Sequence, residues 1–156
     1  MGVGKSTVCE ILNKKLPKCV FLDGDWCWNM HPFVVTEETK RMVMDNICHT
    51  LNNFIACSEF QNILFCWVLH EQGIIDEILS RIDTSDLKVV CVSLIASEKT
   101  LKNRLQKDVD AGLRESDVVE RALARLPMYE KLNTTKIDTD NLTVAEVAQK
   151  IIELTA

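Results

Sequence analysis

Apolar and polar positions follow two alternating patterns along this chain. Apolar residues three and four apart predict helices that bury one face, and short runs rich in β-branched residues predict buried strands. The expected helices cover residues 5–16, 36–56, 74–82, the stretch carrying Leu101 and Leu105, 117–132 and 144–154. The expected strands cover residues 19–22, 62–68, 88–95 and 136–138. This alternation is typical of an α/β fold with parallel strands and crossover helices.

Several element ends carry local signals. Pro17 ends the first helix, because proline cannot continue one. Thr36 is a good N-cap, followed by two glutamates that suit the helix dipole. Ser97 or Ser93 can cap the helix after the third strand. That strand, 88–95, is apolar without alternation, which predicts cover on both of its faces.

Length and charge narrow the class of protein. A chain of 156 residues, 47% of them hydrophobic, is long enough to bury a core, so we expect residues 1–156 to form one domain. The net charge of −5 would repel a polyanion, so we expect no nucleic-acid partner. No apolar run approaches the roughly 18 residues of a membrane span. We therefore expect a cytoplasmic protein without a membrane partner.

Seven cysteines are present, and none belongs to a Cys-x-x-Cys pair. An odd number within mostly apolar segments predicts small buried side chains that stay reduced. A sharper alternative is a metal site built from Cys27 with His31 and Cys66 with His70. Structural zinc sites usually show closer paired spacing, which disfavours this alternative.

The strongest chemical signal lies at the start of the chain. It matches the last part of the phosphate-binding motif G-x-x-x-x-G-K-[ST] and directly precedes a predicted helix. In this motif backbone N–H groups surround phosphate oxygens, Lys5 contacts the β and γ phosphates, and Ser6 offers a hydroxyl to Mg²⁺. The alternative is a glycine-rich turn that only caps a helix. The matching residues are Gly2, Val3, Gly4, Lys5, Ser6 and Thr7.

The motif is incomplete, because its first glycine and the strand before it would precede Met1. That strand is central in a P-loop sheet, and its loss would expose neighbouring strand edges. We therefore expect Met1 to be an internal methionine of a chain with about ten further residues at its N-terminus.

Together with Asp23-Gly24-Asp25 after a strand and arginine-bearing helices near the end, the loop resembles the nucleoside-monophosphate-kinase-like P-loop kinases. The shikimate, gluconate and antibiotic phosphotransferase types, often labelled AAA-type ATPases, are the most similar. The resemblance implies a three-layer P-loop NTPase fold with a parallel sheet of order 2-3-1-4-5, the first strand being missing here. It also implies a helical lid at about residues 106–120. The polar segment at 108–115 likewise suggests a mobile cover there.

In these relatives an Asp-x-Asp pair ends the second strand, and Asp23 and Asp25 match it. The resemblance implies that Asp23 helps to hold Mg²⁺ and that Asp25 positions the acceptor hydroxyl as a catalytic carboxylate. Phosphoryl transfer depends on such alignment and on charge neutralisation. The alternative is an ordinary solvated Asp-Gly-Asp turn.

The resemblance also implies lid arginines that stabilise negative charge during transfer. Arg114 and Arg121 are the catalytic candidates, and Arg125 shares a helix face with Arg121. Arg104 best fits the arginine that stacks on adenine, and Asp138 lies in the loop that borders the adenine. Surface salt bridges and a Thr143 N-cap explain these residues nearly as well.

Acceptor contacts in this fold come from strand ends and the helix after the second strand. Two tryptophans beside an acidic turn suggest a pocket for a flat or apolar ring, although both could be ordinary core residues. The histidines are second-tier candidates. The candidate acceptor residues are Asp25, Trp26, Trp28, His31, Arg41, Trp67 and His70.

These features predict an ATP-dependent phosphotransferase that moves the γ-phosphoryl group to a hydroxyl or phosphate of a small molecule, with ATP and Mg²⁺ as cofactors and a monomer or homodimer as the working form. The strand at 62–68 lacks the terminal Asp or Glu of a Walker B element, which disfavours an ATP-hydrolysing switch. An inactive, truncated P-loop protein is the third alternative.

Overall fold

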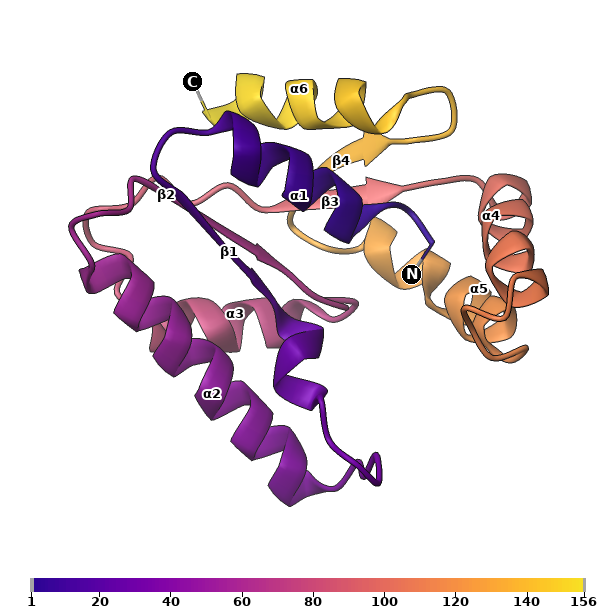
Figure 1. The fold of residues 1–156 in the computed structure, drawn as a ribbon, viewed down its shortest axis with the longest axis horizontal. Coiled ribbons are helices and arrows are strands. Elements are labelled where there is room, and N and C mark those ends of the chain that lie inside the picture. Colours follow the sequence, from indigo (N-terminus) through magenta and orange to yellow (C-terminus); the bar gives the residue numbers. More distant parts are fainter. Residues whose placement is uncertain (1, 156) are drawn as a thin grey trace. The chain divides into compact units, whose positions relative to one another are not determined.

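The computed structural model describes residues 2–155, and Met1 lies outside them. Helices and strands alternate along the chain as the pattern predicts (Figure 1). The elements are α1 (Lys5–Lys15), β1 (Cys19–Asp23), the 3₁₀ helix η1 (Gly24–Trp28), α2 (Glu37–Ala56), β2 (Asn62–Cys66), α3 (Gln72–Arg81), β3 (Val92–Ile95), α4 (Glu98–Asp110), α5 (Val118–Glu130), β4 (Thr135–Asp138) and α6 (Val144–Thr155).

Contacts divide the chain into two compact units. The first unit contains Met1–Val8, His70–Gln72 and Val90–Ala156, and the second contains Cys9–Leu69 and Gly73–Val89. Each unit holds one parallel pair of strands, β3 with β4 in the first and β1 with β2 in the second. The expected order 2-3-1-4-5 counts the missing strand as 1, so its strands 2, 3, 4 and 5 correspond to β1, β2, β3 and β4. It therefore expects the same two pairs, and the order as a whole stays a prediction.

The second unit is built on β1 and β2, which run side by side in register from Cys19 opposite Asn62 to Asp23 opposite Cys66 (Figure 1). Both strands therefore end level, which brings Asp23 and Cys66 together. Residues from β1, α2 and α3 form the core: Leu22, Val43, Met44, Ile47, Cys48, Leu51 and Ile78.

A polar clasp joins α2 to the end of α3 in this unit. The side-chain amide of Asn52 donates to the carbonyl of Arg81 at 2.9 Å, and its oxygen accepts from the N–H of Asp83 at 3.0 Å. The guanidinium of Arg81 also pairs with Asp45 on α2. One side chain thus satisfies backbone groups that the helix end leaves without intrahelical partners.

The first unit pairs β3 with β4 from Val92 opposite Thr135 to Ile95 opposite Asp138. Beside them α4 and α5 pack together (Figure 1). Ser97 caps α4 by accepting from the N–H of Thr100, which selects it over Ser93. The core between the two helices consists of Leu101, Leu105, Val118 and Ala122.

The third predicted strand was too long. Only Val92–Ile95 of this stretch is a strand, and Val89 is 46% exposed, so the expected cover on both faces is wrong for residues 88 and 89. Strand β4 spans only four residues, which limits the length of the ladder that β3 can join. The predicted strand 62–68 likewise ends at Cys66, and the helix expected at 74–82 begins at Gln72.

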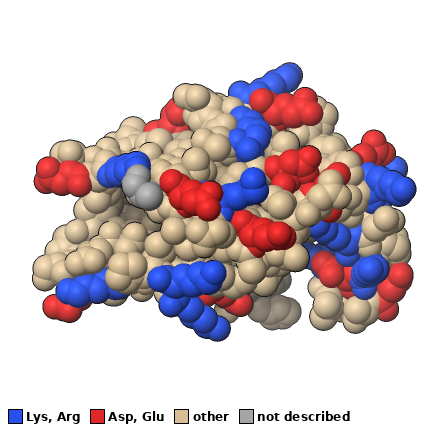
Figure 2. Space-filling view, turned by 90° about the horizontal axis from the view of Figure 1, so that it is seen from above, with Lys and Arg blue, Asp and Glu red and all other residues tan. Residues whose placement is uncertain are grey.

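The cysteines are less buried than expected. All seven are free, but only Cys48 and Cys66 are buried, and the other five are half-buried. Residues 2–155 contain no cluster of three or more His, Cys, Asp or Glu side chains suited to a metal ion, which gives no support to the alternative site at Cys27, His31, Cys66 and His70. Within the same residues, no helix combines the length and apolar character needed to cross a membrane. Acidic and basic side chains are interspersed on the face drawn in Figure 2.

Candidate functional site

The phosphate-loop motif adopts the backbone conformation that its glycines permit. Gly2 has φ of 73° and Gly4 has φ of 87°, values in the left-handed region where other residues are strained. The carbonyl of Gly4 then accepts from the N–H of Val8 at 2.9 Å, which starts α1. The loop therefore leads directly into a helix N-terminus, as the motif predicts.

The loop is also anchored to α4. A β-carbon at Gly2 would lie 2.8 Å from the side chain of Leu105 and 2.9 Å from that of Leu101, both fully buried. Val3 packs against the same cluster. Only glycine fits at position 2, because the backbone there lies directly on packed leucines.

The first turn of α1 suits an anion. It contains no acidic residue, and it carries the half-buried Lys5 and the exposed Ser6 and Thr7. The backbone N–H groups and the dipole of a helix N-terminus make such a position favourable for phosphate, and the ammonium of Lys5 adds positive charge. These residues fit a triphosphate and, through Ser6, its magnesium ion.

Arg104 on α4 is held by Thr139, the residue after β4. Its guanidinium donates to Thr139 Oγ1 at 3.0 Å and to the Thr139 carbonyl at 2.9 Å. The Thr139 side chain is buried and its hydroxyl donates to the carbonyl of Ile95 at 3.0 Å. Thr139 belongs to the loop that the resemblance places beside the adenine, but its bond to Arg104 was not predicted, because only the fold brings it to a residue 35 positions earlier.

Asp140 extends this polar network. Its Oδ1 accepts from the N–H of Ser97 at 2.8 Å. Hydrogen bonds from Ser97, with a smaller contribution from the positive charge of Arg104, hold the pKa of Asp140 below its usual value. Asp138, the expected neighbour of adenine, accepts from the N–H of Asp140 at 2.9 Å.

The other lid candidates pair with nearby carboxylates. Arg114, in the segment between α4 and α5, lies 3.0 Å from Asp108, and Arg121 lies 2.9 Å from Asp117 one turn earlier. These are exposed ion pairs that exchange readily for other partners. The expected lid at 106–120 thus consists of the end of α4, the turn at 111–117 and the first residues of α5.

The acidic turn lies at the end of β1. Asp23 is only 8% exposed, and its Oδ1 accepts from the N–H of Asp25 at 3.0 Å. Asp25 itself is exposed. A β-carbon at the buried Gly24 would lie 2.5 Å from the indole of Trp67, so Trp67 lies directly over the turn. The pair is therefore held by packing and a hydrogen bond rather than being an open solvated turn.

A thiol pair adjoins this carboxylate. Cys66, opposite Asp23 on β2, has a pKa raised above its usual value by a hydrogen bond with Cys9 of α1, by burial and by the nearby charge of Asp23. The residue pattern gave no signal for this contact, because Cys9 and Cys66 come from separate apolar segments.

The two tryptophans of η1 have different environments. Trp26 is 59% exposed and contacts Phe21 edge-on, with ring centroids 5.3 Å apart. Trp28 is half-buried against the core and its ring centroid lies 5.7 Å from that of Phe33. The core alternative therefore holds for Trp28 and is wrong for Trp26.

The candidate residues fall into two groups by unit. The phosphate loop, Arg104, Arg114, Arg121 and Asp138 belong to the first unit. The acidic turn, the tryptophans and the exposed Arg41 of α2 belong to the second. His70, expected among the acceptor residues, lies in the first unit, where its imidazole is 3.5 Å from the Glu71 carboxylate.

Comparison with known proteins places this arrangement in a family. The model of a family described as "AAA domain" matches residues 1–123, which is most of the chain. The chain belongs to the AAA domain family. No curated protein sequence matches this AAA domain protein.

Solved structures share the fold of this AAA domain protein. The tunicamycin resistance protein of Deinococcus radiodurans is similar with a TM-score of 0.71 and 22% identity, over 99% of this chain and 90% of that one. A gluconokinase from Sinorhizobium meliloti has a TM-score of 0.66 and 18% identity, over 98% of this chain and 85% of that one. A sugar kinase from Janibacter has a TM-score of 0.68 and 16% identity, over 97% of this chain and 87% of that one. The chain thus shares its α/β fold with these three proteins, two of which are named as kinases.

Proposed function

We propose that this protein is an ATP-dependent kinase that transfers the γ-phosphoryl group to a hydroxyl or phosphate of a small molecule. The observation that carries the proposal is the phosphate loop. Two left-handed glycines, an acid-free helix start and a half-buried lysine together suit a triphosphate. A plain capping turn would not require Gly2 to lie against Leu101 and Leu105.

Magnesium ATP, when bound, supplies the phosphoryl group and neutralises much of its charge. The N–H groups of the loop and the ammonium of Lys5 would bind the phosphates, and the Ser6 hydroxyl would hold the metal with Asp23 acting through water. Arg104 and Asp138 would border the adenine, where the Thr139 network fixes the orientation of Arg104.

On the acceptor side, Asp25 would orient the hydroxyl and accept its proton late in the transfer. Arg114 and Arg121 would stabilise the developing negative charge after leaving their exposed carboxylate partners. Trp26, Trp28, Arg41 and His70 are the remaining acceptor candidates. A nucleotide-binding switch is less well supported, because β2 ends without a Walker B carboxylate.

Two of the similar structures are a gluconokinase and a sugar kinase, and their small-molecule acceptors support one here. We further propose that the two strand pairs belong to a sheet of order 2-3-1-4-5, and that the chain works as one kinase domain with a lid at 106–120. Each parallel pair is consistent with that order.

Phosphoryl transfer is tested by ADP release with and without a panel of sugars, nucleosides, shikimate-like acids and aminoglycoside-type drugs. Lys5→Ala should lower acceptor-dependent kcat/KM by about a hundredfold or more, because it removes the ammonium that contacts the transferred group. Lys15→Ala, an exposed lysine in the last turn of the same helix, is the matched control and should leave turnover unchanged.

ATP loss at the same rate with every acceptor or none would contradict the kinase and favour a hydrolysing switch. Failure to bind millimolar ATP with magnesium would favour an inactive P-loop protein. Equal activity of Lys5→Ala and Lys15→Ala would remove the proposed role of the loop.

A further inference from the structure

Exposed apolar side chains are concentrated beside the acidic turn. Nine large apolar side chains are exposed within residues 2–155, and five of them lie between residues 26 and 42. Isolated exposed apolar residues are common, but such a concentration marks an interaction site more often. The five and their exposed fractions are Trp26 59%, Phe33 67%, Val34 41%, Val35 53% and Met42 43%.

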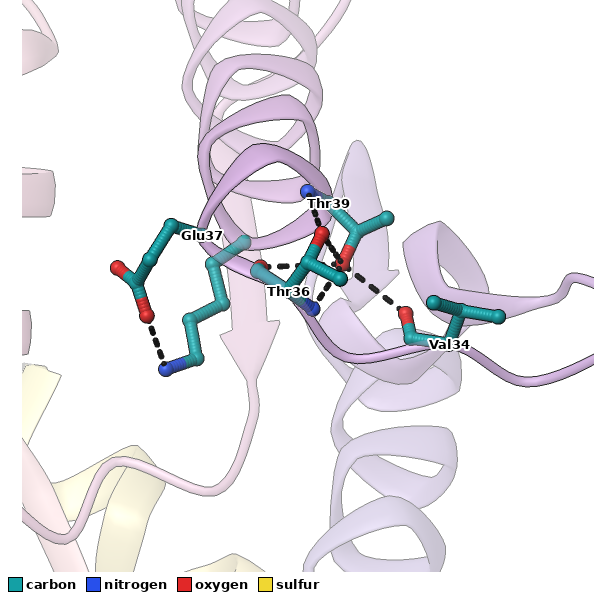
Figure 3. Close-up of polar contacts among 5 residues, drawn as sticks. Val34, Thr36, Glu37 and Thr39 are labelled. Carbon is teal, nitrogen blue, oxygen red and sulfur yellow. Dashed lines mark hydrogen bonds and ion pairs between the residues drawn. The ribbon is translucent and has the colours of Figure 1, made fainter.

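The segment that carries most of them, residues 26–35, is held in place. The ring of Phe33 contacts Trp28, and Trp28 packs against the core of the second unit. The carbonyl of Val34 accepts from Thr39 Oγ1 at 3.0 Å (Figure 3). Phe33 and Val34 are therefore held by contacts within the second unit, which reduces the ordering needed when their side chains bind a partner.

The segment then enters α2 through a capping box. Thr36 Oγ1 accepts from the N–H of Thr39 at 3.2 Å, and Thr39 Oγ1 accepts from the N–H of Thr36 at 2.9 Å (Figure 3). Reciprocal bonds of this kind fix the direction in which a chain enters a helix. Val34 and Val35 are thus presented at a defined position ahead of α2.

The segment contains no Asp, Glu, Lys or Arg between Trp26 and Val35, and its polar side chains include Asn29 and His31. The next cations along the chain are Lys40, which pairs with Glu37 at 2.9 Å, and Arg41. A phosphorylated acceptor requires cations close by, and a polyol requires many hydrogen-bonding groups. The segment has no lysine or arginine and only a few hydrogen-bonding side chains, such as Asn29 and His31, whereas an uncharged ring would find aromatic and branched side chains.

The acidic turn is continuous with this segment, since Asp25 directly precedes Trp26. On the basis of the proposed function, we propose that residues 26–35 bind the apolar ring of an uncharged alcohol, with Trp26 and Phe33 as the specificity residues and Asp25 directed at its hydroxyl. A second copy of the chain is a poorer occupant, because stable protein interfaces need about 800 Å² from each partner, more than five side chains supply.

Naphthalen-2-ylmethanol is the probe, because it combines an apolar ring with one hydroxyl. Its binding is measured without ATP by saturation-transfer NMR on the whole chain. Trp26→Ser and Phe33→Ser should each weaken its Kd by about tenfold, since each removes an exposed aromatic surface. Phe33→Tyr keeps the ring and should restore binding. Leu87→Ser changes a 40% exposed apolar residue outside this segment and outside the proposed lid, and should leave the Kd of the alcohol within about twofold.

Charge selectivity provides a second arm. Naphthalen-2-yl phosphate presents the same ring with a dianion and should bind at least about tenfold more weakly than the alcohol, because the segment offers no lysine or arginine to pair with it. The inference is overturned if the phosphate binds better, if both serine variants bind the alcohol as wild type does, or if the alcohol does not bind. A wild-type dimer that Phe33→Ser dissociates would also overturn it.

The inference and the kinase proposal fail separately. Lys5→Ala should bind the probe as wild type does, because Lys5 lies in the phosphate loop. Loss of phosphoryl transfer with intact, Phe33-dependent probe binding removes only the kinase. If acceptor-dependent turnover is unchanged in Trp26→Ser and Phe33→Ser, only the proposed ring site is contradicted.

Discussion

The glycines of this protein differ in what a β-carbon would meet. Gly2 combines a left-handed backbone with contacts under 3.0 Å to buried leucines, and Gly4 has the left-handed backbone with open space around it. Gly73, within α3, has neither constraint. These three positions separate backbone strain from steric overlap.

Substitution by alanine should follow that ranking. Gly4→Ala should lower the free energy of unfolding by about 1–2 kcal/mol through backbone strain alone. Gly2→Ala should lower it by about 1–3 kcal/mol more, because fully buried leucines cannot move aside. Gly73→Ala should raise it by about 0.5–1 kcal/mol, since alanine favours helix. Urea unfolding measures all three variants. Equal decreases in the free energy of unfolding for Gly2→Ala and Gly4→Ala would show that Leu101 and Leu105 move to make room for the added methyl group.

For single residues, the sequence predicted the conformation correctly where it depends on a local motif. The loop glycines, Thr36 as a cap and Ser97 as a cap are all confirmed in their conformations. The role of Thr139 was missed, because its burial and its bond to Arg104 depend on contacts between distant segments. The exposure of Trp26 could not be predicted for the same reason.

Between elements, the clasp of Asn52 offers a direct test of how α2 and α3 are joined. Asn52→Leu should lower the free energy of unfolding by about 1–3 kcal/mol, because a backbone N–H and a carbonyl lose their partner. Asn53→Leu changes an exposed neighbour in the same helix and is the matched control. Chemical denaturation compares them, and similar values would mean that water replaces the clasp without loss.

The Asp140 network predicts a dependence on pH. The folded pKa of Asp140 is lowered, so its contribution to stability is present above the unfolded pKa and is lost as pH falls through the folded value. Asp140→Asn should therefore be less stable than wild type at neutral pH, with the difference vanishing in acid. Unfolding at a series of pH values measures this, with Asp86→Asn as an exposed control. A constant difference at every pH would show that geometry, not charge, matters.

Element types were predictable because periodicity reports burial of one face. Strand lengths were less so: an apolar run such as 88–95 looks like one long strand, yet β3 pairs only along the four residues of β4. A ladder needs a partner of equal length, and the sequence of one strand does not contain that information.

For the whole molecule, ligand linkage provides a test of the phosphate loop that does not require an acceptor. Magnesium ATP at a hundred times its Kd should stabilise the folded protein by about 2.7 kcal/mol, because only the folded loop binds it. The shift should disappear in Lys5→Ala and persist in Lys15→Ala. Urea midpoints with and without the nucleotide measure it, and an equal shift in Lys5→Ala would place ATP binding elsewhere.

The α/β class and the parallel pairing followed from the sequence, whereas the two compact units did not. Two of their four boundaries fall inside helices, between Val8 and Cys9 in α1 and between Gln72 and Gly73 in α3. No glycine-rich or proline-rich linker marks either boundary. Since sequence reasoning locates domains by such linkers, it could not divide the chain here.

The contact between Trp67 and Gly24 has a practical consequence. The protein contains three tryptophans, so replacing Trp26 and Trp28 by phenylalanine leaves Trp67 as the sole indole fluorophore. Because that indole covers the backbone between the two aspartates, its emission wavelength becomes an optical gauge of the acidic turn, and rearrangements there can be followed in real time while substrates are added.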